Sequence, residues 1–214
     1  FARPGSDIAR EADLSVKSGL TLEEIAAEEP AVWNPATRRL IEAAGARAEH
    51  GPMPEAVAPM LATLVESPPA GEDWLHELKH DGVRVIAYLE RGEVRLASRS
   101  GRDQTALYPE IAEAVGKLVA DRAVLDGEIV ALDESGLPSF QRLQPRMQAA
   151  PREVERLRRE VPVVAFLFDA VYLDGYDLRK MPVEGRKEVL AALLDGAPRE
   201  LLYSDHVVGQ GAEF

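Results

Sequence analysis

Lys79 lies in a short charged segment at the start of a densely patterned region. It stands between Glu77 and Asp81, and Gly82 separates this segment from an apolar run that begins at Val83. Taken alone, the segment predicts a charged surface turn, because turns of this composition are common. A chemical role for the lysine therefore depends on the other polar groups that follow it along the chain.

The first such group is the segment 98–103, in which two arginines flank a Ser-Gly pair. The guanidinium groups of Arg99 and Arg102 match the oxygens of a phosphate, so this turn is a candidate phosphate site. The second group is Asp126-Gly127-Glu128, two acids in the middle of an apolar strand. Burying an acid is unfavourable unless it is paired or bonded to a ligand, although strand alternation could instead place both acids on a solvated face.

The third group, Phe166-Leu167-Phe168-Asp169, is an aromatic pair that ends a short apolar run. Taken alone, this pattern is typical of a hydrophobic core. The four histidines show no metal-ligand spacing and are interpreted as incidental. The arginines between Arg142 and Arg159 alternate with glutamates, which predicts either a DNA-phosphate patch or a solvated helix with ion pairs between neighbouring turns.

Alternating and helical patterns predict the elements that carry these groups. Strands are expected over 83–89, 93–98, 124–132, 163–168 and 201–208, with a turn at Arg91-Gly92. Helices are expected after Pro109, through Val119, and over 138–148 and 182–194. Hairpins mixed with separated helices indicate an α+β fold with mostly antiparallel sheets.

The first 50 residues are polar and acidic, with two short helical patterns over 21–27 and 35–48, and we interpret them as a linker. The proline-rich segment 51–71 is expected to mark a boundary and to pack on the following domain through Met60, Leu61, Leu64 and Val65. The net charge of −12 argues against nonspecific nucleic-acid binding, although a local basic groove remains compatible with it. Absence of cysteine fits a reducing cytoplasm.

In their order and spacing, the four groups resemble the motifs of the covalent nucleotidyltransferases: DNA ligases, RNA ligases and mRNA capping enzymes. The family's lysine motif (Lys, any residue, Asp, Gly, any residue, Arg) is complete from Lys79 to Arg84. From about Pro59 onward, the chain resembles the adenylation domain of an ATP-dependent DNA ligase of the bacterial end-joining type. In that type, ligase, polymerase and phosphoesterase modules can share one chain.

This resemblance implies a nucleotidyltransferase (ATP-grasp-like) fold for residues 51–214. Residues 1–50 are then a linker and the tail of a preceding phosphoesterase-like module. The family's later Glu-Gly motif and its paired-lysine motif do not occur before Phe214. We therefore expect a fold that is incomplete at its C-terminus and a piece that is inactive in sealing by itself.

The resemblance also implies a site. Lys79 would become linked to AMP from ATP, with Mg²⁺ or Mn²⁺ as the metal, and AMP would then pass to the 5′-phosphate of a nick or end. The implied roles are ribose or phosphate contact by Arg84, phosphate contact by Arg99, a ribose hydrogen bond to Glu128, adenine stacking on Phe168, a position beside adenine for Glu77 and metal placement by Asp81. A free lysine has a pKa of about 10.4, so attack by Lys79 requires a lowered pKa.

The implied partners are nicked or broken duplex DNA and the Ku end-binding protein, in a cytoplasmic, nucleoid-associated setting without a membrane. Two alternatives remain open from the residues. One is an RNA ligase or capping-type guanylyltransferase, which the lysine motif does not separate from a DNA ligase. The other is a non-catalytic fragment that binds only nucleotide or DNA.

Overall fold

The computed structural model describes residues 35–43, 48–209 and 211 of the 214-residue chain. The chain divides into two compact units, Phe1–Trp33 and Asn34–Phe214, and all described residues belong to the second. The helical pattern expected over 21–27 lies outside the described residues. Among the described residues, no helix is both long enough and apolar enough to cross a bilayer.

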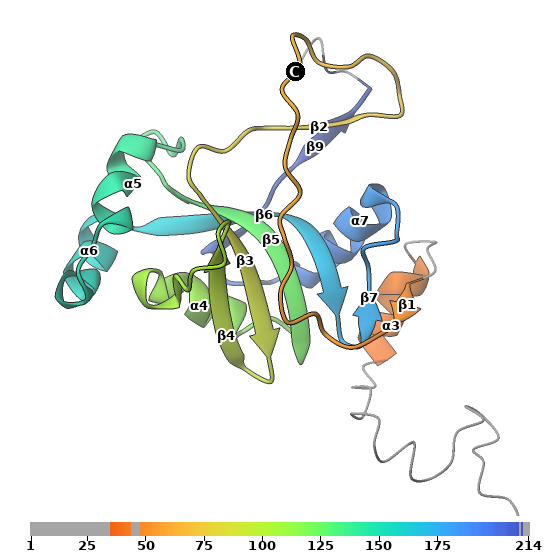
Figure 1. Cartoon of the computed structure of the whole chain (residues 1–214), viewed down its shortest axis with the longest axis horizontal. Helices are drawn as coiled ribbons and strands as arrows, with labels where there is room; N and C mark the ends of the chain where they lie inside the picture. The colour runs from red at the N-terminus through yellow and green to blue at the C-terminus, as the bar shows by residue number, and fades with distance from the viewer. Residues whose placement is uncertain (1–34, 44–47, 210, 212–214) are drawn as a thin grey trace, which may run out of the picture. The chain divides into compact units, whose positions relative to one another are not determined.

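A twisted sheet organises the second unit (Figure 1). Its strands run in the order β1-β7-β6-β5-β3-β4, and β8 pairs with β6. Neighbouring strands are antiparallel except β6 and β8, which are parallel. The strands are β1 (Glu49–His50), β3 (Val83–Glu90), β4 (Glu93–Ser98), β5 (Arg122–Ala131), β6 (Val163–Leu173), β7 (Tyr176–Asp177) and β8 (Leu201–Tyr203). A separate two-stranded sheet pairs β2 (Leu75–Glu77) with β9 (His206–Val208).

One face of the large sheet carries the main hydrophobic core. Alternate residues of β3 and β5, such as Val85, Leu89, Leu125 and Ile129, point into it. The helices are α3 (Pro35–Ala43), α4 (Pro109–Val115), α5 (Phe140–Met147), α6 (Val154–Glu160) and α7 (Val183–Leu193), with 3-10 turns at Thr105–Leu107 and Pro151–Glu153. Residues of α3, α4, α5 and α7 contribute to this core, so these helices cover that face.

The opposite face of the sheet is crossed by the proline-rich segment (Figure 1). Met53 and Val57 pack there against a second, smaller apolar cluster. The Val57 amide donates a hydrogen bond to the Tyr88 hydroxyl at 2.7 Å, and Arg95 donates to the Glu55 carbonyl at 2.9 Å. This segment does pack on the domain, as expected, but through these contacts.

The residues expected to make that packing are instead exposed to solvent. They are Met60, Leu61, Leu64 and Val65. Val119 and Val183, apolar residues of two expected helices, are exposed as well, and the helix expected through Val119 ends at Val115. These side chains were expected inside because of their hydrophobicity alone. Apolar atoms nevertheless make up a large part of the surface of a folded protein.

The α+β class, the mainly antiparallel sheet and the Arg91-Gly92 turn are confirmed, with both turn residues at positive φ. The single strand expected over 201–208 is wrong. It divides into β8 and β9, which join different sheets, because Ser204 and Asp205 lie outside both ladders. Helix α3 also differs from a free linker, since Ile41 is buried in the main core and Thr37 donates a hydrogen bond to Asp174 at 2.7 Å.

Candidate functional site

The polar groups singled out in the sequence meet at one end of the large sheet. The loop after β2 carries Lys79 into the start of β3, and antiparallel pairing sets Ser98, the last residue of β4, opposite Val85. The same pairing sets Arg84 opposite Glu128 of β5, and Glu128 opposite Phe166 of β6. Strand pairing thus brings three segments that are far apart in sequence beside the lysine loop: the end of β4, β5 at Glu128 and β6 at Phe166.

Lys79 projects into solvent, with its side chain 85% exposed. Its ammonium pairs with the Asp81 carboxylate, and the Nζ–Oδ1 distance is 2.9 Å. The hydrogen bond to Asp81, followed by the charge of the same group, raises the pKa of Lys79. The lowered pKa expected for a nucleophilic Lys79 is therefore not found in this structure.

Glu128 fixes the loop that carries Lys79. One carboxylate oxygen of Glu128 accepts a hydrogen bond from the Gly82 amide at 3.0 Å. Gly82 lies so close to β5 that an added Cβ would stand 2.1 Å from the Ile129 carbonyl oxygen. Only glycine therefore lets the loop approach the strand this closely. Burial raises the pKa of Glu128, while the Gly82 amide and the charge of Arg84 act in the opposite direction.

Arg84 and Asp126 form a two-pronged ion pair on the face of the sheet crossed by the proline-rich segment. The two guanidinium–carboxylate distances are 3.0 and 2.7 Å, and Arg84 also donates to the Met60 carbonyl at 2.8 Å. Asp126 is 6% exposed, so the solvated-face interpretation of this acid is wrong. Burial raises the pKa of Asp126, and the hydrogen bond from Arg84 opposes that shift.

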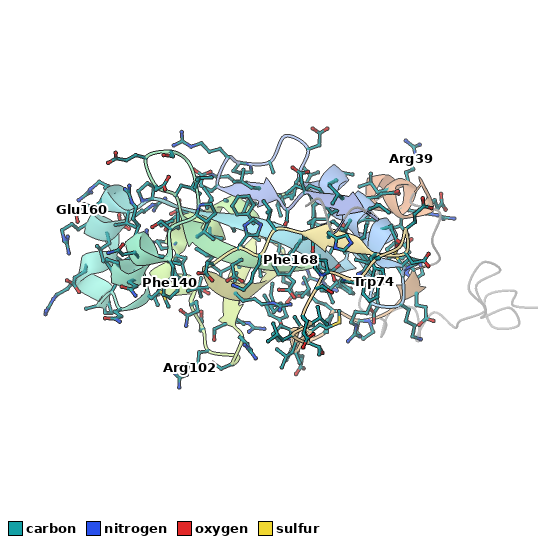
Figure 2. The ribbon with its side chains drawn as sticks, turned by 90° about the horizontal axis from the view of Figure 1, so that it is seen from above. Arg39, Trp74, Arg102, Phe140, Glu160 and Phe168 are labelled. Carbon is teal, nitrogen blue, oxygen red and sulfur yellow. The ribbon has the colours of Figure 1, made fainter. Side chains whose placement is uncertain are left out.

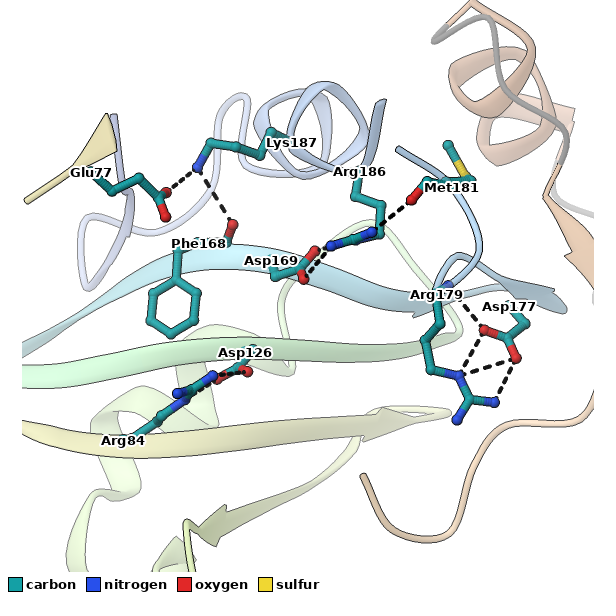
Figure 3. A network of polar contacts seen from close by, with 10 residues as sticks. All are labelled: Glu77, Arg84, Asp126, Phe168, Asp169, Asp177, Arg179, Met181, Arg186 and Lys187. Carbon is teal, nitrogen blue, oxygen red and sulfur yellow. Dashed lines mark hydrogen bonds and ion pairs between the residues drawn. The ribbon is translucent and has the colours of Figure 1, made fainter. Parts of the chain in front are cut away.

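A bulge in β6 leaves Phe168 without a partner in the β5–β6 register. The β5–β6 register pairs Asp126 with Asp169 and Gly127 with Leu167, and so passes over Phe168. The Phe168 ring lies 5.2 Å from the Arg84 guanidinium, whereas Asp169 receives two hydrogen bonds from Arg186 of α7, at 2.7 and 3.0 Å (Figure 3). Phe168 is half-buried and belongs to neither core cluster, so the core interpretation of this residue is not supported.

Glu77 is held by a lysine that the sequence argument did not single out. The Lys187 ammonium, on α7, pairs with the Glu77 carboxylate and also donates to the carbonyls of Ser204 (3.0 Å) and Phe168 (3.4 Å) (Figure 3). Lys187 is 1% exposed, whereas the Glu77 side chain is 34% exposed. The available signal was the position of Lys187 three residues before Leu190, on the apolar side of a predicted helix.

His80, interpreted as incidental, also has a defined place. Its ring stacks on Phe166 with centroids 4.0 Å apart, and its Nε2 lies 3.2 Å from the Ser204 hydroxyl. Burial lowers the pKa of His80. These three residues line a cavity of about 150 Å³ together with Leu78, Tyr203, Asp205, His206 and Val207.

The two arginine groups behave differently. The Ser98–Asp103 turn forms as expected, with Gly101 at a φ of +80°, and the side chain of Arg99 is exposed and makes no hydrogen bond or ion pair within the described part of the chain. Arg102 and Glu160 both lie at the margins of the unit, away from Phe168 (Figure 2). The side chains of Arg99 and Arg102 are therefore both accessible to solvent.

Three of the six arginines between Arg142 and Arg159 are paired with acids. Arg146 is fully buried, forms two hydrogen bonds to Glu110 and supports the carbonyls of Leu107 and Val161. Arg158 pairs with Glu113 on α4, and Arg156 pairs with Glu153 and Glu160. A DNA-phosphate patch that includes Arg146 is therefore wrong, because its guanidinium has no access to a ligand.

Comparison with known proteins places this geometry in a family. The family model described as "ATP dependent DNA ligase domain" matches residues 59–213. The chain belongs to the ATP-dependent DNA ligase domain family. This confirms the resemblance to the adenylation domains of such ligases.

The curated relatives include two multifunctional non-homologous end joining proteins LigD. The chain is 44% identical to that of Pseudomonas aeruginosa over 151 residues, which are 71% of this chain and 17% of the relative. It is 39% identical to that of Mycolicibacterium smegmatis over 163 residues, 75% of this chain and 19% of the relative. The chain thus spans about a fifth of the length of these relatives.

Two solved structures show the same fold. The ligase domain of LigD from M. tuberculosis superposes with a TM-score of 0.59 at 35% identity, covering 73% of this chain and 47% of that one. A mycobacterial DNA ligase D complexed with ATP and MES gives a TM-score of 0.53 at 36% identity, covering 65% of this chain and 42% of that one.

Proposed function

We propose that this chain is the nucleotide-binding part of an ATP-dependent DNA ligase of the end-joining type, and that Lys79 is its site of AMP attachment. The observation that carries this proposal is the convergence of the Lys79 loop, Arg84, Glu128 and Phe168 at one end of the sheet, in a chain of the ligase domain family. Residues 51–214 would form the nucleotidyltransferase (ATP-grasp-like) domain. Residues 1–50 would form the link to a preceding phosphoesterase-like module and its tail, with helix α3 and strand β1 of this stretch packed on the ligase domain.

The proposed reaction begins with attack of the neutral Lys79 amine on the α-phosphorus of ATP. A nitrogen–phosphorus bond forms, the bond between the α-phosphorus and the bridging oxygen breaks, and pyrophosphate leaves with that oxygen. The amine loses its proton as the phosphoramidate forms. AMP then passes to the 5′-phosphate of a DNA nick, and attack by the neighbouring 3′-hydroxyl releases it.

The surrounding side chains have matching capacities. The half-buried Phe168 ring can stack on a purine, an aromatic contact worth about 1–3 kcal/mol per base. Glu128, placed by the Gly82 amide, has a second oxygen to accept a hydrogen bond from the ribose. Arg84 would contact ribose or phosphate after exchanging part of its bonding to Asp126 and Met60.

Two further roles concern the phosphates. The exposed Arg99 would contact a phosphate of the nucleotide or of the nick. Within the described residues, no three or more histidine or acid side chains gather into a preformed metal cluster. Mg²⁺ commonly takes one or two carboxylates and completes its shell with phosphates and water, so the exposed Asp81 fits as a single carboxylate ligand for Mg²⁺ or Mn²⁺. When bound, the ion would neutralise charge on the triphosphate.

The substrate proposed for the whole protein is a nicked or broken DNA duplex, and the Ku end-binding protein is a proposed partner. Both follow from the relatives, which are end-joining proteins by name. The proposed location is the bacterial cytoplasm, at the nucleoid.

Labelled nucleotide tests the proposal against its alternatives. The chain is incubated with Mg²⁺ and ATP or GTP carrying a radioactive α-phosphate, and is then separated under denaturing conditions. A covalent label from ATP alone supports the ligase. A label from GTP supports a capping-type guanylyltransferase, and no label from either supports a fragment that only binds.

A further inference from the structure

Lys187 occupies a site that the proposed chemistry does not use. Its ammonium is buried and bridges three segments: Glu77 on β2, the Phe168 carbonyl on β6 and the Ser204 carbonyl after β8 (Figure 3). The Tyr203 ring lies 4.8 Å from the same nitrogen. An ammonium has three protons, and three protein acceptors receive them, so Lys187 has no proton left to offer a ligand.

Glu77 is the exposed end of this arrangement. Its Oε1 atom meets Lys187, while the side chain remains 34% exposed and Oε2 makes no hydrogen bond within the described residues. Because the Glu77 carboxylate and the Phe168 backbone bind one nitrogen, they lie close together. The Phe168 ring itself points to the Arg84 side of β6 (Figure 3), so the placement of Glu77 beside the adenine edge is taken from the proposed nucleotide site.

A carboxylate accepts hydrogen bonds and does not donate them. Adenine presents an amino group at its 6 position, which can donate to such an oxygen. Guanine and hypoxanthine present a carbonyl oxygen at the same position, and two acceptors facing each other are unfavourable. A carboxylate held in a fixed direction thus favours adenine.

We propose that Lys187 is a positioning residue that sets the base selectivity of this site, by holding Glu77 as a hydrogen-bond acceptor facing the purine edge. The inference rests on the proposed nucleotide site, and it adds a residue that acts without touching the nucleotide. Removing the ammonium frees Glu77 to turn toward solvent. The property that is lost is then the discrimination between bases. A hydrogen bond to a charged group corresponds to roughly a tenfold or larger factor in affinity.

The test is calorimetric titration of the whole chain with ATP and with inosine triphosphate (ITP). The wild type is expected to prefer ATP, and Lys187→Met to reduce the ITP-to-ATP ratio of Kd values by about tenfold. Lys187→Arg should restore part of the ratio. The control Lys180→Met removes an exposed ion pair with Glu49 and should leave the ratio unchanged.

For each variant, the Kd values for ATP and ITP are measured on one preparation. A smaller folded fraction then affects both titrations equally and leaves the ratio of the two Kd values unchanged. If Lys187→Met fails to fold, Lys187→Arg tests the positioning by Lys187. Glu77→Gln tests the acceptor itself, because its amide can donate to the hypoxanthine oxygen and should also lower the ratio. In the double variant, Lys187→Met should add little to Glu77→Gln if it acts through that residue.

An unchanged ratio in Lys187→Met or in Glu77→Gln overturns the inference while leaving the proposed function intact. So does a full additional loss in the double variant. Failure of the wild-type chain to bind either nucleotide overturns the proposed function and the inference with it.

Discussion

Replacing Phe168 by alanine separates a nucleotide-stacking role from a structural one. The ring is half-buried, lies over the Arg84 guanidinium and belongs to neither hydrophobic cluster. If it stacks on adenine, losing about 1–3 kcal/mol weakens ATP binding about 5- to 150-fold. The free energy of unfolding should fall as well, but by less than the usual loss when a core phenylalanine is replaced by alanine, which is about 3–5 kcal/mol.

Leu167 provides a matched comparison, because it is the preceding residue on the same strand and points into the main core at 1% exposure. Leu167→Ala should lower the free energy of unfolding by about 2–5 kcal/mol while the folded protein keeps its ATP affinity. Phe168→Tyr should retain both properties. Calorimetric titration with ATP and urea unfolding of the same preparations provide the two measurements. Equal ATP affinity in wild type and Phe168→Ala, or a stability loss equal to that of Leu167→Ala, would refute the stacking role.

Three further substitutions address the lysine loop and the arginine-rich helices. Asp81→Asn removes the hydrogen bond and the charge that raise the pKa of Lys79, so the alkaline rise in the rate of AMP attachment should move to lower pH; an unmoved pH–rate profile would contradict this. Arg146→Met leaves Glu110 buried without a partner and should lower the free energy of unfolding by about 3–5 kcal/mol in urea, with DNA affinity of the folded protein unaltered. Gly82→Ala places a Cβ 2.1 Å from a backbone oxygen, so it should lower the melting temperature and prevent AMP labelling; normal labelling would show that the loop does not need this close approach.

The strands that carry the site could be predicted from the sequence because their alternation is regular. Val83 to Leu89 and the Arg91-Gly92 turn give a clear two-residue period with a turn between strands, and the structure has this hairpin. The order of motifs was also sufficient to identify the family, since a lysine, an acid pair and an aromatic at these spacings occur together. The roles assigned to individual side chains remain predictions that the substitutions above test.

The remaining features depend on tertiary contacts that leave no periodic signal. The bulge at Phe168 arises from pairing with β5, so the register that passes over Phe168 cannot be read from the strand pattern. From the sequence, Arg146 was expected to face solvent and Lys187 was not singled out. A buried cation is recognised only by its partners, which the sequence does not show. The division of 201–208 into two strands likewise follows from which neighbours are available.

The most direct test of the account is covalent labelling of the chain by ATP carrying a radioactive α-phosphate. We expect the wild type to retain the label under denaturing conditions and Lys79→Ala to retain none, since Lys187, the other lysine described beside Glu77 and Phe168, is buried and paired. Lys79→Arg should fail as well, because a guanidinium is almost always protonated. The exposed Lys180→Ala, which removes only a surface ion pair, should label normally. A label of wild-type strength on Lys79→Ala would contradict the assignment of the nucleophile and of the site built around it.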